Sequence, residues 1–144
     1  MANVQRFWPG QRVSNWLTTL ASLNVTGALD VTGAVTAGSL VAPLAFNAQT
    51  GTTYTFVLAD AGKMVTFANG SAQTITVPPN SSVAFAVGTQ IILQGILAGT
   101  VTLVAGAGVT VNSKDSNLAI DGQWAAVTLI KTATDVWSLI GALA

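Results

Sequence analysis

Histidine, cysteine and glutamate are absent from this 144-residue chain, which carries five aspartates and five basic residues. General acid–base catalysis near neutral pH usually relies on histidine or on a perturbed carboxylate, and a nucleophilic hydroxyl needs a base beside it. Zinc, iron and copper are held mainly by cysteine and histidine. The sequence therefore predicts a protein that is not an enzyme, without catalytic residues, metal or cofactor.

Charge is also scarce: charged residues make up 7% of the chain, hydrophobic residues make up 51%, and the formal net charge is zero. A neutral chain lacks the basic field that binds nucleic acid. Every apolar run is broken well before the roughly 20 residues that a membrane-spanning helix needs, and Pro9, Gly10 and Arg12 interrupt any signal peptide. We expect neither nucleic acid nor a membrane as partner. So little charge predicts instead a surface buried against other subunits, or one covered by threonine, serine, asparagine and glutamine.

The first 22 residues contain both arginines and two of the four tryptophans. Val13, Trp16, Leu17 and Leu20 have the spacing of one apolar helix face, but so short a helix is marginal alone. Aromatic residues and arginine are enriched at interface hot spots. Residues 1–22 are thus predicted to be an anchoring arm that binds another protein; the alternative is a segment that caps its own domain. The predicted anchor residues are Arg6, Phe7, Trp8, Arg12, Val13, Trp16 and Leu17.

Residues 23–40 repeat with a period of six: LNVTGA is followed by LDVTGA and by the looser VTAGSL. Apolar residues alternate with polar ones inside each unit, as in a strand. Such short repeats bury apolar surface by stacking or by pairing with other chains. We predict a homotrimeric stem; a β-hairpin or an apolar linker are the alternatives. The side chains placed around its three-fold axis would be Leu23, Val25, Leu29, Val31 and Val35.

Residues 41–144 predict a single all-β domain. Runs rich in valine, isoleucine, threonine and phenylalanine alternate with glycine-, proline- and asparagine-containing turns. Strands at about ten-residue spacing favour an antiparallel β-sandwich or a jelly-roll-like barrel. The eight predicted strands are 53–58, 63–67, 73–77, 89–94, 100–104, 109–112, 123–131 and 136–140.

The order of short motifs in this domain resembles a β-domain common in tailed-bacteriophage virion proteins. The motifs are TFVLADAGK (55–63), ITVP (75–78), VGTQI (87–91), VTL (101–103), GAGVTV (106–111) and WSLIG (137–141). The repeats of 23–40 are similar to those of fibre stalks, which are commonly homotrimeric. The resemblance implies a virion component at a fibre end or on a capsid protrusion, and brings no catalytic or binding residues with it.

The small number of repeats narrows the kind of virion protein that we expect. Two and a half repeats make a stub rather than the long shaft of a receptor-binding tail fibre. We therefore expect a trimeric capsid decoration or head-fibre protein, anchored by its arm to the major capsid protein or another virion protein. It would be located in the virion, which is assembled in the host cytoplasm. The alternative is a tail fibre or tail appendage that binds a receptor or a host-surface glycan.

Three further features are candidate sites or turns. Trp124 and Trp137 could form a stacking platform for sugars, or fill the core or a subunit interface. Asp60 is predicted to be a turn residue that accepts backbone N–H bonds. The segment 112–117 has oxygen-bearing side chains at alternate positions, as in some calcium loops, but its lysine and single carboxylate favour a polar surface loop.

Overall fold

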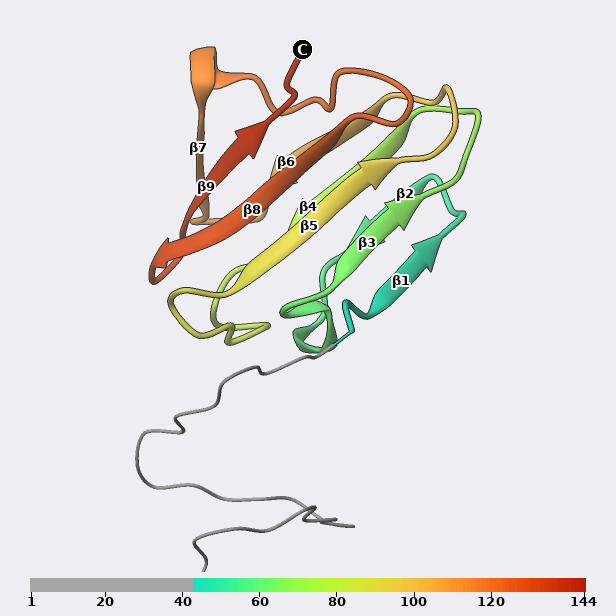
Figure 1. Ribbon diagram of the computed structural model, residues 1–144. Coiled ribbons are helices and arrows are strands. Elements are labelled where there is room, and N and C mark those ends of the chain that lie inside the picture. The colour runs from blue at the N-terminus through green and yellow to red at the C-terminus, as the bar shows by residue number, and fades with distance from the viewer. Residues whose placement is uncertain (1–42) are drawn as a thin grey trace, which may run out of the picture. The chain divides into compact units, whose positions relative to one another are not determined.

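The computed structural model describes residues 43–144, which form an all-β unit (Figure 1). Two single-turn 3-10 helices, η1 (Leu58–Asp60) and η2 (Lys114–Ser116), accompany the strands. The predicted all-β class is confirmed. None of the helices in this described part is long and apolar enough to cross a membrane. The strands are β1 (Phe46–Gln49), β2 (Thr53–Thr55), β3 (Met64–Phe67), β4 (Gln73–Val77), β5 (Gln90–Gly95), β6 (Val101–Ala105), β7 (Thr110–Ser113), β8 (Ala126–Ala133) and β9 (Val136–Gly141).

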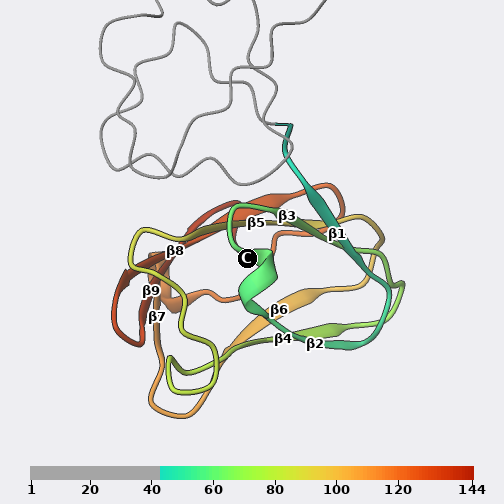
Figure 2. The ribbon, with the colours of Figure 1, turned by 90° about the horizontal axis from the view of Figure 1, so that it is seen from below.

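The strands form two sheets that lie face to face (Figures 1 and 2). Sheet A has six strands in the order β1-β3-β5-β8-β9-β7, and sheet B has three in the order β2-β4-β6. The first six strands alternate between the sheets along the chain. Each consecutive pair, β1–β2, β3–β4 and β5–β6, is therefore one turn of a coil that adds a strand to both sheets.

The predicted antiparallel, jelly-roll-like sandwich is wrong in strand direction, because most neighbouring strands are parallel. The pairs β1–β3, β3–β5, β2–β4, β4–β6 and β7–β9 are parallel. Because the chain crosses to the other sheet after each strand, it returns to the first sheet running in the same direction. Alternation of apolar and polar residues reports that one face is buried, but it is the same for parallel and antiparallel strands.

The last strands end this coil. β8 runs antiparallel to β5 on one side and to β9 on the other, and a two-residue turn at Thr134 and Asp135 joins β8 to β9. Asp135 has φ 54°, in the left-handed region that aspartate tolerates better than most residues. β7 then completes the sheet beside β9.

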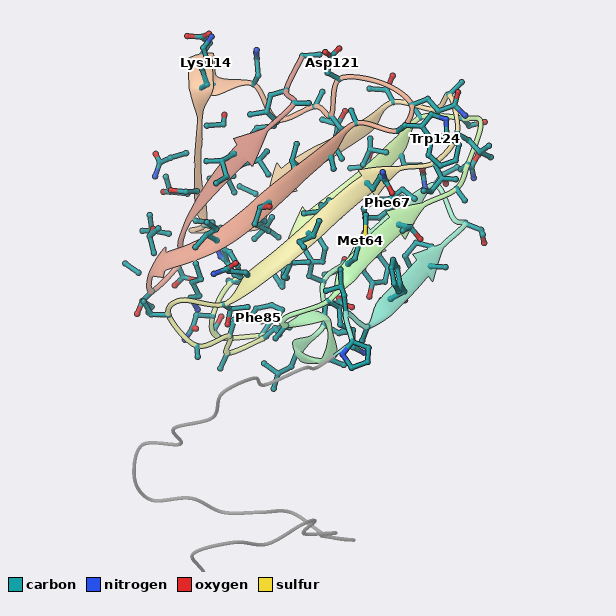
Figure 3. The ribbon with its side chains drawn as sticks, in the orientation of Figure 1. Met64, Phe67, Phe85, Lys114, Asp121 and Trp124 are labelled. Carbon is teal, nitrogen blue, oxygen red and sulfur yellow. The ribbon has the colours of Figure 1, made fainter. Side chains whose placement is uncertain are left out.

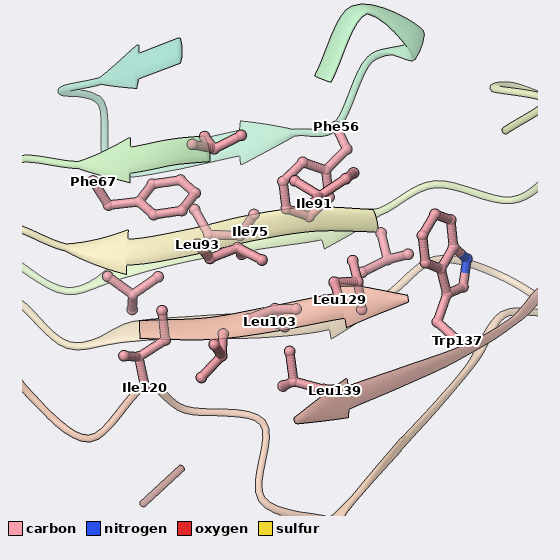
Figure 4. Close-up of a cluster of buried hydrophobic side chains, with 14 of the residues drawn as sticks. Phe56, Phe67, Ile75, Ile91, Leu93, Leu103, Ile120, Leu129, Trp137 and Leu139 are labelled. Atoms are coloured by element: carbon pink, nitrogen blue, oxygen red, sulfur yellow. The ribbon is translucent and has the colours of Figure 1, made fainter. Parts of the chain in front are cut away.

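The core fills the space between the sheets with alternate side chains of the facing strands (Figure 4). In β4 and β5 each buried residue is followed by a more exposed one, as a pleated strand with one buried face requires. Trp137 packs edge-to-face on Phe85, with ring centroids 5.4 Å apart. The largest fully buried apolar side chains are Phe56, Phe67, Ile75, Ile91, Leu93, Leu103, Ile120, Leu129, Trp137 and Leu139.

Candidate functional site

The outward face of sheet A carries a row of mostly apolar side chains that crosses five strands. Buried and more exposed residues alternate along these strands, so the more exposed residues point away from sheet B. Residues of the row lie directly opposite one another in the strand register. In order, the row is Phe46, Met64, Ile92, Thr128 and Ile140, which we call the outer row.

The two ends of the outer row are strongly exposed: Phe46 retains 64% and Ile140 55% of its accessible surface. Met64, near the middle of this face in Figure 3, and Ile92 are half-buried. None of the outward positions of the strands of sheet A carries a charge. An exposed, uncharged and mostly apolar stripe is the kind of surface patch that marks an interaction site.

The outward face of sheet B is chemically different, because threonine occupies nearly all of it. The register aligns Thr53 with Thr74 and Thr74 with Thr102, and it aligns Thr55 with Thr76. Threonine suits the outer side of a strand because its branched Cβ fits the pleated surface, while its hydroxyl can bond water. The two faces of the molecule thus differ, and the apolar one belongs to sheet A.

Trp124 is a second exposed feature, at the end of β5 opposite to Phe85 (Figure 3). It is 62% exposed and has φ 65°, a left-handed conformation that is rare for a bulky residue. Its backbone is fixed on both sides: its N–H donates to the carbonyl of Gly95 at 2.7 Å, and its carbonyl accepts from Nε2 of Gln94 at 3.2 Å. The loop therefore holds an indole outward on a fixed backbone.

Trp137, in contrast, is 1% exposed and belongs to the core. Of the two alternatives, stacking platform or core residue, Trp137 is a core residue and Trp124 is exposed. The two tryptophans therefore do not form a shared platform. Nothing in the sequence around them separated the two, since each is the second residue of a predicted strand, 123–131 or 136–140.

A partly buried polar cluster joins β1, β2 and η1 in the first turn of the coil. The carboxylate of Asp60 accepts bonds from Nδ2 of Asn47 at 2.7 Å, from the Tyr54 hydroxyl at 2.8 Å and from the backbone N–H of Val57 at 2.9 Å. The last bond confirms the prediction that Asp60 is a turn residue that accepts a backbone N–H. Burial of the phenol and its bond to Asp60 raise the pKa of Tyr54 to about 12. We interpret the cluster as structural, because all three donors come from the protein itself.

The predicted anchor and stem residues lie outside the described residues. This applies to the arm, 1–22, with Arg6, Phe7, Trp8, Arg12, Val13, Trp16 and Leu17. It applies also to the stem, 23–40, with Leu23, Val25, Leu29, Val31 and Val35.

The segment 112–117 comprises the end of β7, η2 and Asn117. Nζ of Lys114 pairs with the carboxylate of Asp115, and both side chains are well exposed. Within residues 43–144 no group of three or more histidine, cysteine, aspartate or glutamate side chains lies close enough to hold a metal ion.

The outer row was not anticipated from the sequence, because it exists only through the register of five strands. Its signal was nevertheless present. Apolar residues stand side by side at Ile91-Ile92-Leu93 and at Leu139-Ile140, where an ordinary one-sided strand would alternate with polar residues. Such doublets indicate a strand with both faces apolar.

Comparisons with protein-family models, with curated proteins and with solved structures gave no match to this chain.

Proposed function

We propose that this protein is a structural subunit of a bacteriophage particle, a homotrimeric capsid decoration or head-fibre protein. It acts by assembling with copies of itself and by gripping the major capsid protein, or another virion protein, with its N-terminal arm. The observation that carries the proposal is the outer row on the uncharged face of sheet A. The motif order and the six-residue repeats support the phage assignment through resemblance alone.

A second copy of the chain is the partner that suits the outer row. An uncharged apolar face offers no salt bridges to a charged partner, but three copies of it can converge on a three-fold axis without like-charge repulsion. Burial of apolar surface stabilises by about 25 cal/mol per Å², before the cost of association is subtracted. The exposed Phe46 and Ile140 would contribute most, because they have most surface left to bury. The repeats of 23–40 supply a three-fold stem in the same assembly.

The experiment is a pair of charge substitutions with light scattering of the full chain. Ile92→Lys places an ammonium in the centre of the outer row, and we expect the trimer to dissociate. Thr76→Lys is the matched control, because Thr76 is also β-branched, half-buried and in the central strand of the opposite sheet. Its variant should remain trimeric. A wild-type chain that is monomeric at micromolar concentration, or an Ile92→Lys variant that remains trimeric, would contradict the proposal.

A second candidate function, recognition of a host-surface glycan or receptor as part of a tail fibre or tail appendage, is favoured by Trp124. Aromatic faces stack on sugars, and this indole is 62% exposed on a fixed loop. Trp124→Ala should then abolish adsorption of phage to cells without changing capsid stability. Under the first function the same variant adsorbs normally, while particles without the protein lose capsid stability.

A further inference from the structure

Lys131 is the most unusual charged residue among residues 43–144. It points inward from β8 and is 2% exposed. Lysine is almost never fully buried unless it is paired. Yet within the described residues Lys131 has no carboxylate within ion-pair distance, since the pair found there joins Lys114 to Asp115. A buried ammonium without a counter-ion is expensive, so its surroundings need an explanation.

The lysine amine lies against one particular side-chain amide. Nζ of Lys131 is 2.5 Å from Oδ1 of Asn80 and 2.9 Å from the carbonyl oxygen of Phe85. The ring of Trp137 covers it, with the centroid 5.7 Å from Nζ. A carbonyl bond is about 1.23 Å long, so Cγ of Asn80 is at most about 3.7 Å from Nζ. That is close to the separation from which a bound nucleophile attacks.

A carboxylate holds the backbone of the same asparagine. Oδ1 of Asp135 accepts the backbone N–H of Asn80 at 2.6 Å. Asp135 lies in the β8–β9 turn, four positions after Lys131, and its positive φ fixes this part of the turn. An amine, an amide and a carboxylate are thus assembled from two segments about 50 positions apart, beside the aromatic rings of Phe85 and Trp137.

We infer that Lys131 and Asn80 become joined by an intramolecular isopeptide bond. The ammonium of Lys131 first gives one proton to water. The resulting amine attacks Cγ of Asn80, a C–N bond forms, and the carbonyl electron pair moves to Oδ1. When the carbonyl re-forms, the bond from Cγ to Nδ2 breaks. Nδ2 leaves as ammonia, with the proton that Nζ has given up, transferred through a water molecule. One amide replaces another, so the step needs no oxidant, reductant or activating group.

Two physical effects favour this product. The amide is neutral, so its formation removes an ammonium from a site without a counter-ion. The reacting atoms are held together by the fold, which replaces an encounter in solution by a positioned, effectively unimolecular step. The bond would tie the long loop between β4 and β5 to the centre of sheet A.

The test is the intact mass of the purified, denatured full-length chain. We expect a mass one ammonia below that of the sequence, and a branched fragment joining residues 80 and 131 in tandem mass spectrometry. Asn80→Ala should have its full sequence mass. A folded wild-type chain that keeps its full sequence mass after prolonged incubation overturns the inference.

A cyclic imide at Asn80 and Ser81 would also release one ammonia, and a control variant separates the two. Lys131→Arg cannot form the isopeptide bond but leaves Asn80 and Ser81 unchanged. Its mass should be that of its sequence, and a persisting loss of ammonia would overturn the inference.

Asp135→Ala tests the positioning of Asn80. It removes the acceptor of the Asn80 backbone N–H, so the loss of ammonia should slow at least tenfold in a chain that circular dichroism shows to be folded. An unchanged rate would overturn the positioning role of Asp135.

Discussion

At the scale of single residues, the carboxylate of Asp60 is 1% exposed, beneath the first turn of the coil. Burying such a group is tolerable only if its oxygens are hydrogen-bonded, and here a side-chain amide, a phenol and a backbone N–H supply the bonds. The bond from the Val57 backbone N–H could be predicted from the sequence, because it joins residues of one turn. Asn47 and Tyr54 are 13 and 6 positions away, and only the passage of the chain from sheet A to sheet B brings them to Asp60.

Tyr54 gives this cluster a measurable titration, because it is the single tyrosine of the chain. The raised pKa of about 12 should appear in the tyrosinate absorbance of the folded protein, whereas the unfolded chain should titrate near 10. Between these values the unfolded state loses the phenol proton and the folded state keeps it. The stability contributed by the neutral phenol is therefore complete below pH 10 and lost as the pH rises towards 12.

Urea unfolding at a series of pH values should show this loss, and Tyr54→Phe removes the group responsible. The difference in free energy of unfolding between wild type and variant should shrink from pH 10 upwards. A folded protein whose tyrosine titrates near 10 would contradict the assignment.

At the scale of elements, all eight strands predicted from periodicity exist. Most of their predicted first and last residues differ from the observed ones by one to three positions. The strand that was missed, β1, has the sequence FNAQ, without the β-branched residues that signal a strand. It is extended because it pairs with β3 in parallel register. Its conformation therefore depends on a tertiary contact and not on the local sequence. The prediction also extended β8 backwards over Gln123 and Trp124, where the structure has a loop with a positive φ.

The β5–β6 loop packs closely on the β3–β4 loop in the preceding turn of the coil, and glycine permits this contact. A Cβ at Gly99 would lie 2.1 Å from the carbonyl oxygen of Ser71 and 2.4 Å from that of Asn69, in the preceding turn of the coil. Gly99→Ala should therefore lower the free energy of unfolding by about 2 kcal/mol or more, since backbone must move to admit the methyl group.

Gly70 supplies the matched control, because a Cβ there meets nothing within 4 Å and its φ is not positive. Gly70→Ala should leave the free energy of unfolding unchanged or raise it by about 0.5 kcal/mol. Equal denaturation midpoints for the two variants would mean that the turns of the coil do not pack as described.

At the scale of the whole molecule, composition predicted that surface would be buried against other subunits or covered by uncharged polar residues. In the described part threonines cover the outward face of sheet B, and the apolar outer row, which we propose is buried against other copies, crosses the outward face of sheet A. The choice of face could not be made from the sequence, because a shift of the register by one residue exchanges the two sides of a strand.

The proposed arm is tested at this scale by deletion of residues 1–22. Because the outer row and the repeats of 23–40 remain, the truncated chain should still form the wild-type oligomer by light scattering. It should no longer co-sediment with phage particles that lack the protein, since three arms bound together contribute avidity that the body alone does not. An unfolded truncated chain, or one that binds particles with undiminished affinity, would refute the anchor.

The parallel coil also dictates an order of folding. Ala133 pairs with Val136, three positions later in the chain. By contrast, Phe46 pairs with Met64, eighteen positions later, and Met64 pairs with Ile92, twenty-eight positions later. Closing long loops before any contact is gained is slow, so the β8–β9 hairpin should form first and offer an edge to β5. That hairpin is the last part of this unit to leave the ribosome. The nascent chain of this unit should therefore stay open until β8 and β9 have left the ribosome, and then wind onto that hairpin.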